Sequence, residues 1–148
     1  MPGPGPGPET QPETHPATPA LERFARETLG CQCAPEVFRH VEDSPLDLPG
    51  LPAPARRIAF GGRLLVYLCP VSDATATAVA AGERIGDWVA AGLAERDRRG
   101  MNRLRLVLAT EAWTPAAAQV IETAFARLPG LDDRVHLHLI PARALDCI

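Results

Sequence analysis

The chain has 148 residues, 46% of them hydrophobic, which is enough for one domain with its own core and short for two. All 15 basic residues are arginine, which excludes chemistry that needs a lysine amine, and the net charge of −3 disfavours nonspecific binding to nucleic acid. The longest apolar run, residues 64–71, is too short to cross a bilayer, and no signal peptide precedes it, so we expect a soluble cytoplasmic protein without a membrane partner.

The first part of the chain is dominated by proline and glycine. Residues 1–18 contain almost no side chain that could be buried, and proline cannot donate a backbone hydrogen bond. We therefore expect a disordered tail over residues 1–18, followed by a single α/β domain over residues 19–148.

Two short helices are predicted to open this domain. Thr18 and Pro19 form a helix start, with threonine as the N-cap and proline at the first helical position. Gly30 is placed to end the first helix in a left-handed conformation, and Pro35 begins the second. The four prolines that follow within residues 44–55 predict a connecting loop there.

The remainder predicts the order β-β-α-β-α-β. Gly61 and Gly62 are typical of a two-residue hairpin turn, and the strand after them, residues 63–69, is apolar on both faces, as in a central strand. The later elements are a helix over 74–99, a strand over 104–109, a helix that begins at 114–115 and a strand over 135–139. Gly82 and Gly86 are expected to let the first long helix approach the sheet closely.

Chirality then fixes the arrangement. Strand–helix–strand units need parallel strands and right-handed crossovers, so both long helices should lie on one face of the sheet. The N-terminal helices are the elements left to cover the other face. We predict an α/β fold in which an N-terminal helix pair is followed by a β-β-α-β-α-β unit that forms a four-stranded mixed sheet.

A Cys-x-Cys turn lies between the two N-terminal helices. Cys33 comes two residues before the helix start at Pro35, where free amides and the helix dipole would stabilise a thiolate. Cys31 and Cys33 could hold a soft metal, zinc or copper(I), or close a disulfide. His40 is a candidate third ligand and Cys147 a further one, and two copies of the turn in a homodimer would supply four thiolates. The alternative is that both thiols are buried packing residues.

Two histidines form a weaker candidate. His136 and His138 point to the same side of the last strand, at a spacing that allows both imidazoles to reach one metal. The same side of the preceding strand carries Arg103 and Arg105, which would repel a metal. The alternative is an ordinary polar face of an edge strand.

Arginine is concentrated just before and within the third strand. Arg forks suit phosphate and carboxylate, so this cluster is a candidate anion-binding site. Its members are Arg96, Arg98, Arg99, Arg103 and Arg105. The first three also fit a structural role at a helix C-terminus, where cations are favoured. No glycine-rich phosphate loop accompanies them.

No complete catalytic set is apparent in the sequence, so an enzyme is not the leading interpretation. The leading hypothesis is a small cytoplasmic, non-enzymatic accessory protein that binds a protein partner and holds a soft metal in its Cys-x-Cys turn. One alternative is a thiol–disulfide redox protein in which Cys33 attacks and Cys31 resolves. The other is a regulatory domain that binds an anion through the arginine cluster.

Overall fold

The computed structural model describes residues 13–71, 74–111, 113–146 and 148. The strands are β1 (Val41–Leu46), β2 (Ala55–Phe60), β3 (Leu64–Pro70), β4 (Arg103–Thr110) and β5 (Val135–Pro141). The α-helices are α1 (Pro19–Arg23), which continues as a π-helical turn (Phe24–Thr28), α2 (Ala74–Arg98) and α3 (Pro115–Ala126). Short 3-10 helices occupy Pro35–Arg39 and Ala142–Leu145. None of the helices within these ranges is long and apolar enough to cross a membrane.

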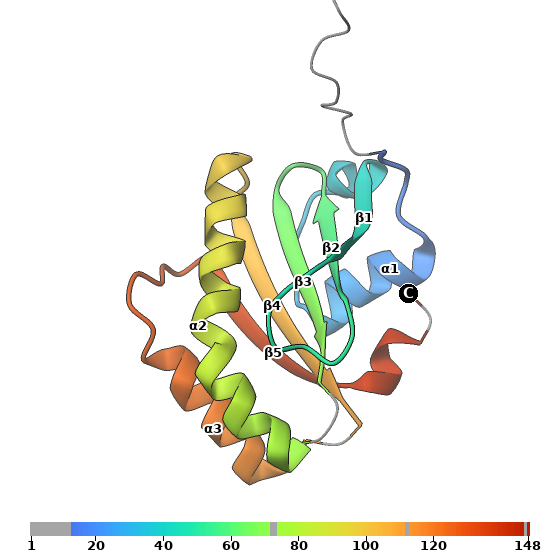
Figure 1. Ribbon diagram of the computed structural model, residues 1–148. Helices are drawn as coiled ribbons and strands as arrows, with labels where there is room; N and C mark the ends of the chain where they lie inside the picture. The colour runs from blue at the N-terminus through green and yellow to red at the C-terminus, as the bar shows by residue number, and fades with distance from the viewer. Residues whose placement is uncertain (1–12, 72–73, 112, 147) are drawn as a thin grey trace, which may run out of the picture.

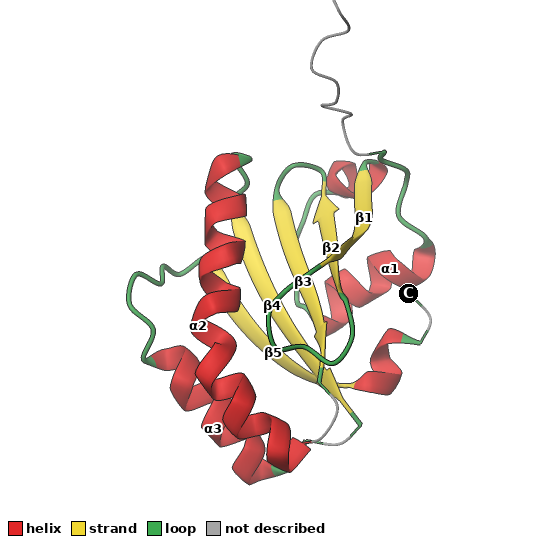
Figure 2. Ribbon diagram, viewed as in Figure 1, coloured by secondary structure: helices red, strands yellow, loops and turns green. Residues whose placement is uncertain are grey.

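The strands form one mixed sheet in the order β1-β2-β3-β4-β5 (Figure 2). The pairs β1–β2 and β2–β3 are antiparallel, whereas β3–β4 and β4–β5 are parallel. Gly61 and Gly62 form the turn between β2 and β3 with φ of 58° and 70°, so the hairpin prediction is confirmed. The strand β3 lies in the middle of the sheet and is buried on both faces from Leu64 to Cys69, as its apolar pattern predicted.

The two faces of the sheet are covered by different parts of the chain (Figure 1). The helices α2 and α3 pack on one face, where Trp88 and Ile121 join a core with Leu65 and Leu106. The segment from α1 to the 3-10 helix Pro35–Arg39 covers the other face, in a core built around Val66 and Val107. The prediction that both long helices share one face is confirmed. Crossovers between parallel strands have the same handedness, which places successive helices on the same side of the sheet.

The predicted four-stranded sheet is wrong, because the structure has a fifth strand. The strand β1 runs through residues that the prolines had assigned to a loop over 44–55, and Pro45 lies within it, opposite Arg56. A proline is tolerated there because β1 is an edge strand, where an amide need not be donated on the open side. Only the residues between β1 and β2 remain as a loop.

The predicted N-terminal helix pair is wrong as well. Its first member is a single α-helical turn and a half that widens into a π-helical turn, and its second is the five-residue 3-10 helix Pro35–Arg39. The start of the first member is as predicted, since Oγ1 of Thr18 accepts from the Leu21 amide at 3.1 Å. The second stops early because Val41 already pairs in β1 opposite Phe60.

The predicted tail falls in two parts. Residues 1–12 lie outside the described residues. The backbone of His15 pairs with Val41 in both directions, with N–O distances of 3.0 and 2.8 Å, and the Ala17 amide donates to the Phe38 carbonyl at 2.8 Å. The disorder of residues 1–18 stays a prediction, but in the structure His15 forms a bridge to Val41 at the edge of the sheet next to β1.

Glycines in α2 serve two different neighbours. A Cβ at Gly82 would lie 3.5 Å from Val120, and one at Gly86 would lie 3.3 Å from Leu128, so both glycines face α3 or the residues just after it. A Cβ at Gly92 would lie only 2.7 Å from Leu104 of β4. The close approach of the helix to the sheet thus occurs at Gly92, and its assignment to Gly82 and Gly86 is wrong.

Candidate functional site

A groove of about 1010 Å³ opens on the sheet face that α1 covers. One wall is formed by the Cys-x-Cys turn and the 3-10 helix after it, and the other by the first residues of β3, β4 and β5. Its polar and sulfur-bearing lining side chains are Cys31, Gln32, Cys33, Glu36, His40, Arg63, Asn102, Arg103, Arg105 and His136. The groove therefore joins the thiol candidates to part of the arginine cluster, which the sequence analysis had treated separately.

The Cys-x-Cys turn is set by the end of the π-helical turn. Gly30 adopts a φ of 70°, so the predicted left-handed stop is confirmed, and the Cys31 amide donates to the Ala25 carbonyl at 2.9 Å. The chain then leaves the helix towards the sheet. As a result the side chain of Cys31 enters the core, where the residue is 7% exposed, while Cys33 is only partly buried.

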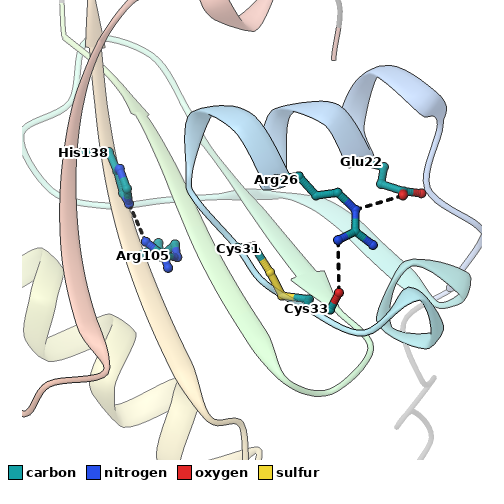
Figure 3. Close-up of a disulfide and its surroundings, with 6 residues drawn as sticks. All are labelled: Glu22, Arg26, Cys31, Cys33, Arg105 and His138. Atoms are coloured by element: carbon teal, nitrogen blue, oxygen red, sulfur yellow. Dashed lines mark hydrogen bonds and ion pairs between the residues drawn. A yellow bond between two sulfur atoms is a disulfide. The ribbon is translucent and has the colours of Figure 1, made fainter.

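Arg26 contacts the backbone of the Cys-x-Cys turn. Its Nη1 donates to the carbonyl of Cys33 at 3.2 Å, and its Nε forms an ion pair with Glu22 at 3.1 Å (Figure 3). Its guanidinium carbon also lies 4.7 Å from the centre of the Phe38 ring. Arg26 is not among the residues that line the groove, so these contacts fix the backbone at Cys33 from outside the groove.

The two cysteines are joined by a disulfide, with their Cα atoms 5.3 Å apart (Figure 3). Both cysteines line the groove and both pack against the core, with Cys31 buried and Cys33 only partly buried. Cys69 is a free thiol on β3, and burial raises its pKa to about 12, so it stays protonated. The turn therefore holds the other two cysteines of the described residues.

Arg105, on β4, lines the wall of the groove opposite the Cys-x-Cys turn. The residue is only 8% exposed, and its Nη1 lies 2.8 Å from Nε2 of His138 (Figure 3). Its Nε is buried without a hydrogen-bond partner among the described residues. Burial lowers the pKa of this guanidinium, and the neighbouring charge of Arg103 lowers the same pKa further.

His138 is the neutral partner of this arginine. Burial lowers the pKa of His138 to about 4, and the charges of Arg105 and His136 act in the same direction. Because an arginine can only donate, the neutral imidazole accepts the hydrogen bond through Nε2. Burial and the same arginine lower the pKa of His136 as well, and its Nε2 is buried without a partner in the described part of the chain.

The structure does not gather the predicted arginine cluster in one place. Arg96 pairs with Asp132 at 3.0 Å and also with Asp97, and Arg99 pairs with Glu42 at 2.7 Å and also with Glu95, so the carboxylates of the fold neutralise both. Arg98 is exposed and does not line the groove. Arg103 and Arg105 lie two residues apart on β4, so both side chains point to the sheet face that α1 covers, and both line the groove.

The sequence analysis missed Arg63 as a site residue. It precedes β3, and the parallel register places Leu64 opposite Arg103, so the two arginines begin neighbouring strands. Both side chains are exposed and line the groove. The sequence does place an arginine at the start of each of two parallel strands, but only the strand register shows that the two arginines lie side by side.

The candidate metal ligands are not gathered into a metal site. Within the described ranges, no three His, Cys, Asp or Glu side chains lie close enough together to hold a metal ion. His40 is exposed and lines the same groove as Cys31 and Cys33, but the three do not form such a group. His136 and His138 share a strand face, and Cys147 lies outside the described residues.

Comparison of the chain with protein-family models, with curated proteins and with solved structures gives no match. These comparisons therefore assign no function to the fold or to the site. What the groove can do follows from its own chemistry, which is a disulfide on one wall and a set of arginines on the other.

Proposed function

We propose that the chain is a thiol–disulfide redox protein in which Cys31 and Cys33 cycle between a disulfide and a dithiol. The observation that carries this proposal is the pairing of the two cysteines in a groove, with Cys33 partly exposed and Cys31 buried. A partly exposed disulfide closed across a single intervening residue fits the labile kind better than the structural kind.

The burial difference assigns the order of bond exchange. An external thiolate attacks Sγ of Cys33, the less buried of the two groove-lining cysteines, and Cys31 leaves as a thiolate. A second external thiolate then attacks the external sulfur of the mixed disulfide, and Cys33 leaves as the second thiolate. Two electrons pass from the external thiols to the protein, which ends as a dithiol while the thiols end as a disulfide.

The charges around the groove support thiolate chemistry. A thiolate is stabilised by nearby cations, and three arginines line this groove, namely Arg63, Arg103 and Arg105. The sequence analysis had assigned this role to a helix start at Pro35. The 3-10 helix there has only five residues, so its dipole is small, and the arginines replace it as the source of positive charge.

The partner-binding accessory protein with a soft metal remains the competing proposal. Zinc or copper(I) would need both thiolates of the turn and at least one further ligand, from His40 or from a second copy of the chain. The two proposals differ in a measurable quantity, because a metal site keeps both cysteines reduced whereas a redox site oxidises them reversibly.

The test uses the positions of the arginines. Trypsin releases residues 27–39 as one peptide that holds Cys31 and Cys33 and no other cysteine, while Cys69 lies in another peptide. The folded protein is equilibrated in buffers of increasing reduction potential, its free thiols are alkylated, and the peptides are weighed. We expect peptide 27–39 to change by two electrons reversibly, with a midpoint of about −180 to −270 mV, while Cys69 stays unmodified.

The control variants separate the alternatives. Cys69→Ser should leave the transition of peptide 27–39 unchanged, and Cys33→Ser should abolish it. A pair that remains reduced across the whole series contradicts the redox proposal. Stoichiometric zinc or copper(I) after anaerobic purification, lost in the variant Cys31→Ala/Cys33→Ala, would establish the metal site instead.

A further inference from the structure

We propose that the groove selects a low-molecular-weight thiol that carries a carboxylate, and that Arg105, together with Arg103 and Arg63, forms the subsite for that carboxylate. This inference rests on the proposed redox function and adds the chemical class of its substrate. In the exchange, the carboxylate of the thiol binds the arginines while its thiolate sulfur bonds to Cys33 and displaces Cys31 as a thiolate.

Two buried arginines differ in how their charge is paired. Arg96 and Arg105 are equally buried, at 6% and 8% exposure. Arg96 pairs with Asp132 at 3.0 Å and with Asp97, so the fold compensates its charge. Within the described residues, the side chain of Arg105 hydrogen-bonds only to the neutral His138, and its buried Nε has no partner. A buried charge is costly unless it is paired, and a ligand carboxylate would pair it.

The charged side chains of the groove are mostly positive. Three arginines line it, against one carboxylate, Glu36, which lies on the wall of the Cys-x-Cys turn and is exposed. The opposite wall, where Arg63, Arg103 and Arg105 lie, carries no acidic side chain among the described lining residues. A guanidinium fork suits a carboxylate because it can donate two parallel hydrogen bonds.

The arginines and the disulfide lie in one groove. Arg105 and the disulfide face the same groove from opposite walls (Figure 3). The groove is large enough for a small molecule with both a thiol and a carboxylate. A charged hydrogen bond in such a place changes binding by about 10- to 100-fold, so charge should dominate the choice among small thiols.

The experiment measures how fast three small thiols reduce the oxidised protein. The probes are anionic mercaptosuccinate, neutral thioglycerol and cationic cysteamine. Each rate is divided by the rate of the same thiol with a small uncharged disulfide, so that intrinsic reactivity cancels. For the wild-type protein we expect mercaptosuccinate to exceed thioglycerol by about 10-fold or more, cysteamine to be slowest, and added salt to weaken the preference.

Variants assign the preference to its residues. Arg105→Met should remove most of it, and Arg98→Met, an exposed arginine outside the groove, should keep it. Arg103→Met is the second test, since that side chain is exposed and its loss should not affect folding, and it should reduce the preference in part. Succinate, which has the carboxylates but no sulfur, should inhibit the reaction of mercaptosuccinate with the wild-type protein.

The outcomes separate the two proposals. If all three thiols reduce peptide 27–39 at equal normalised rates, the carboxylate subsite is overturned and the redox function stands. If none of them reduces it, the redox function fails and the subsite fails with it. A preference for cysteine peptides flanked by aspartate, without any preference for mercaptosuccinate, would overturn the small thiol in favour of a protein substrate.

Discussion

The two faces of the sheet differ in whether their buried charged side chains have partners of opposite charge. On the face covered by α2, Glu95 accepts hydrogen bonds from Arg57 at 2.9 Å, from Tyr67 at 2.5 Å and from Arg99 at 2.8 Å. On the face covered by α1, Arg105 is buried against the neutral His138. The same sheet therefore carries one neutralised network and one cation without an acidic partner among the described residues.

This difference shows how a structural arginine can be told from a functional one. Sequence places Arg96, Arg99, Arg103 and Arg105 in one short stretch, but the structure gives the first two carboxylate partners and turns the other two towards the groove. The residue type is the same in both groups. What separates them is whether the fold itself supplies the opposite charge.

The largest expected effect comes from breaking the neutralised face. Glu95→Gln should lower the free energy of unfolding by about 3 kcal/mol, because it leaves Arg57 and Arg99 near a neutral amide in a buried place. The side chain of Glu95 is only 7% exposed. Urea denaturation measures the change, and Asp97→Asn is the matched control, a carboxylate on the same helix that is 68% exposed and should cost under about 1 kcal/mol.

The same variant has a defined pH dependence. Burial raises the pKa of Glu95, but the hydrogen bonds from Tyr67, Arg99 and Arg57 outweigh it and leave that pKa below its ordinary value of 4.5. The stabilisation is therefore complete above pH 4.5 and is lost as the pH falls through the lower folded value. The gap between wild type and Glu95→Gln should narrow in acid, and a gap that stays constant would contradict the network.

An intermediate effect is expected at the groove wall. A Cβ at Gly61 would lie 2.6 Å from Cα of Val37, so this glycine lets the 3-10 helix rest on the hairpin. Gly62 has a similar positive φ but no atom within 4 Å of such a Cβ. Both alanine variants should lose about 1–2 kcal/mol to left-handed strain, and Gly61→Ala about 1–2 kcal/mol more from overlap with backbone.

Only one of these two variants should disturb the site. Gly61 and Val37 both line the groove, so Gly61→Ala should also change the alkylation rate of reduced Cys33. Gly62→Ala should leave that rate as it is in the wild type. Equal losses of stability in the two variants, measured by urea denaturation, would show that the contact with Val37 does not hold the wall.

Sequence reasoning succeeded where one local pattern decided the structure. The hairpin at Gly61 and Gly62, the cap at Thr18 and the central strand β3 follow from backbone freedom, capping and two-sided burial. It failed at β1, because Pro45 is a strand breaker in the interior of a sheet and acceptable at its edge. Edge position is a property of the whole sheet and cannot be read from the prolines.

The site divides in the same way. The two cysteines were singled out from their spacing alone, and in the structure they are joined to each other, while their role stays a prediction. Their meeting with Arg63, Arg103 and Arg105 was not predicted, because it depends on the register between β3 and β4 and on which face each strand presents. Chain proximity grouped Arg105 with Arg98, whereas the fold grouped it with Cys33.

The smallest expected effect, a pKa shift on the groove face, distinguishes the two faces most sharply. The pKa of His138 is lowered to about 4 by burial first and then by Arg105 and His136. Arg105→Met should raise that pKa, but not to the ordinary 6.5, because the burial remains. Titration of the imidazole protons by NMR measures the shift, and Arg98→Met should leave the pKa unchanged.

The sign of this shift predicts where the groove face responds to acid. Because His138 binds its proton more weakly in the folded state, the unfolded state takes up more protons below pH 6.5, and stability falls as the pH drops from 6.5 towards 4. The face with Glu95 begins to respond only below pH 4.5. In Arg105→Met the loss between pH 6.5 and 4 should be smaller than in wild type. A loss of unchanged size would mean that Arg105 does not act on His138, and the contrast between the two faces would then rest on burial alone.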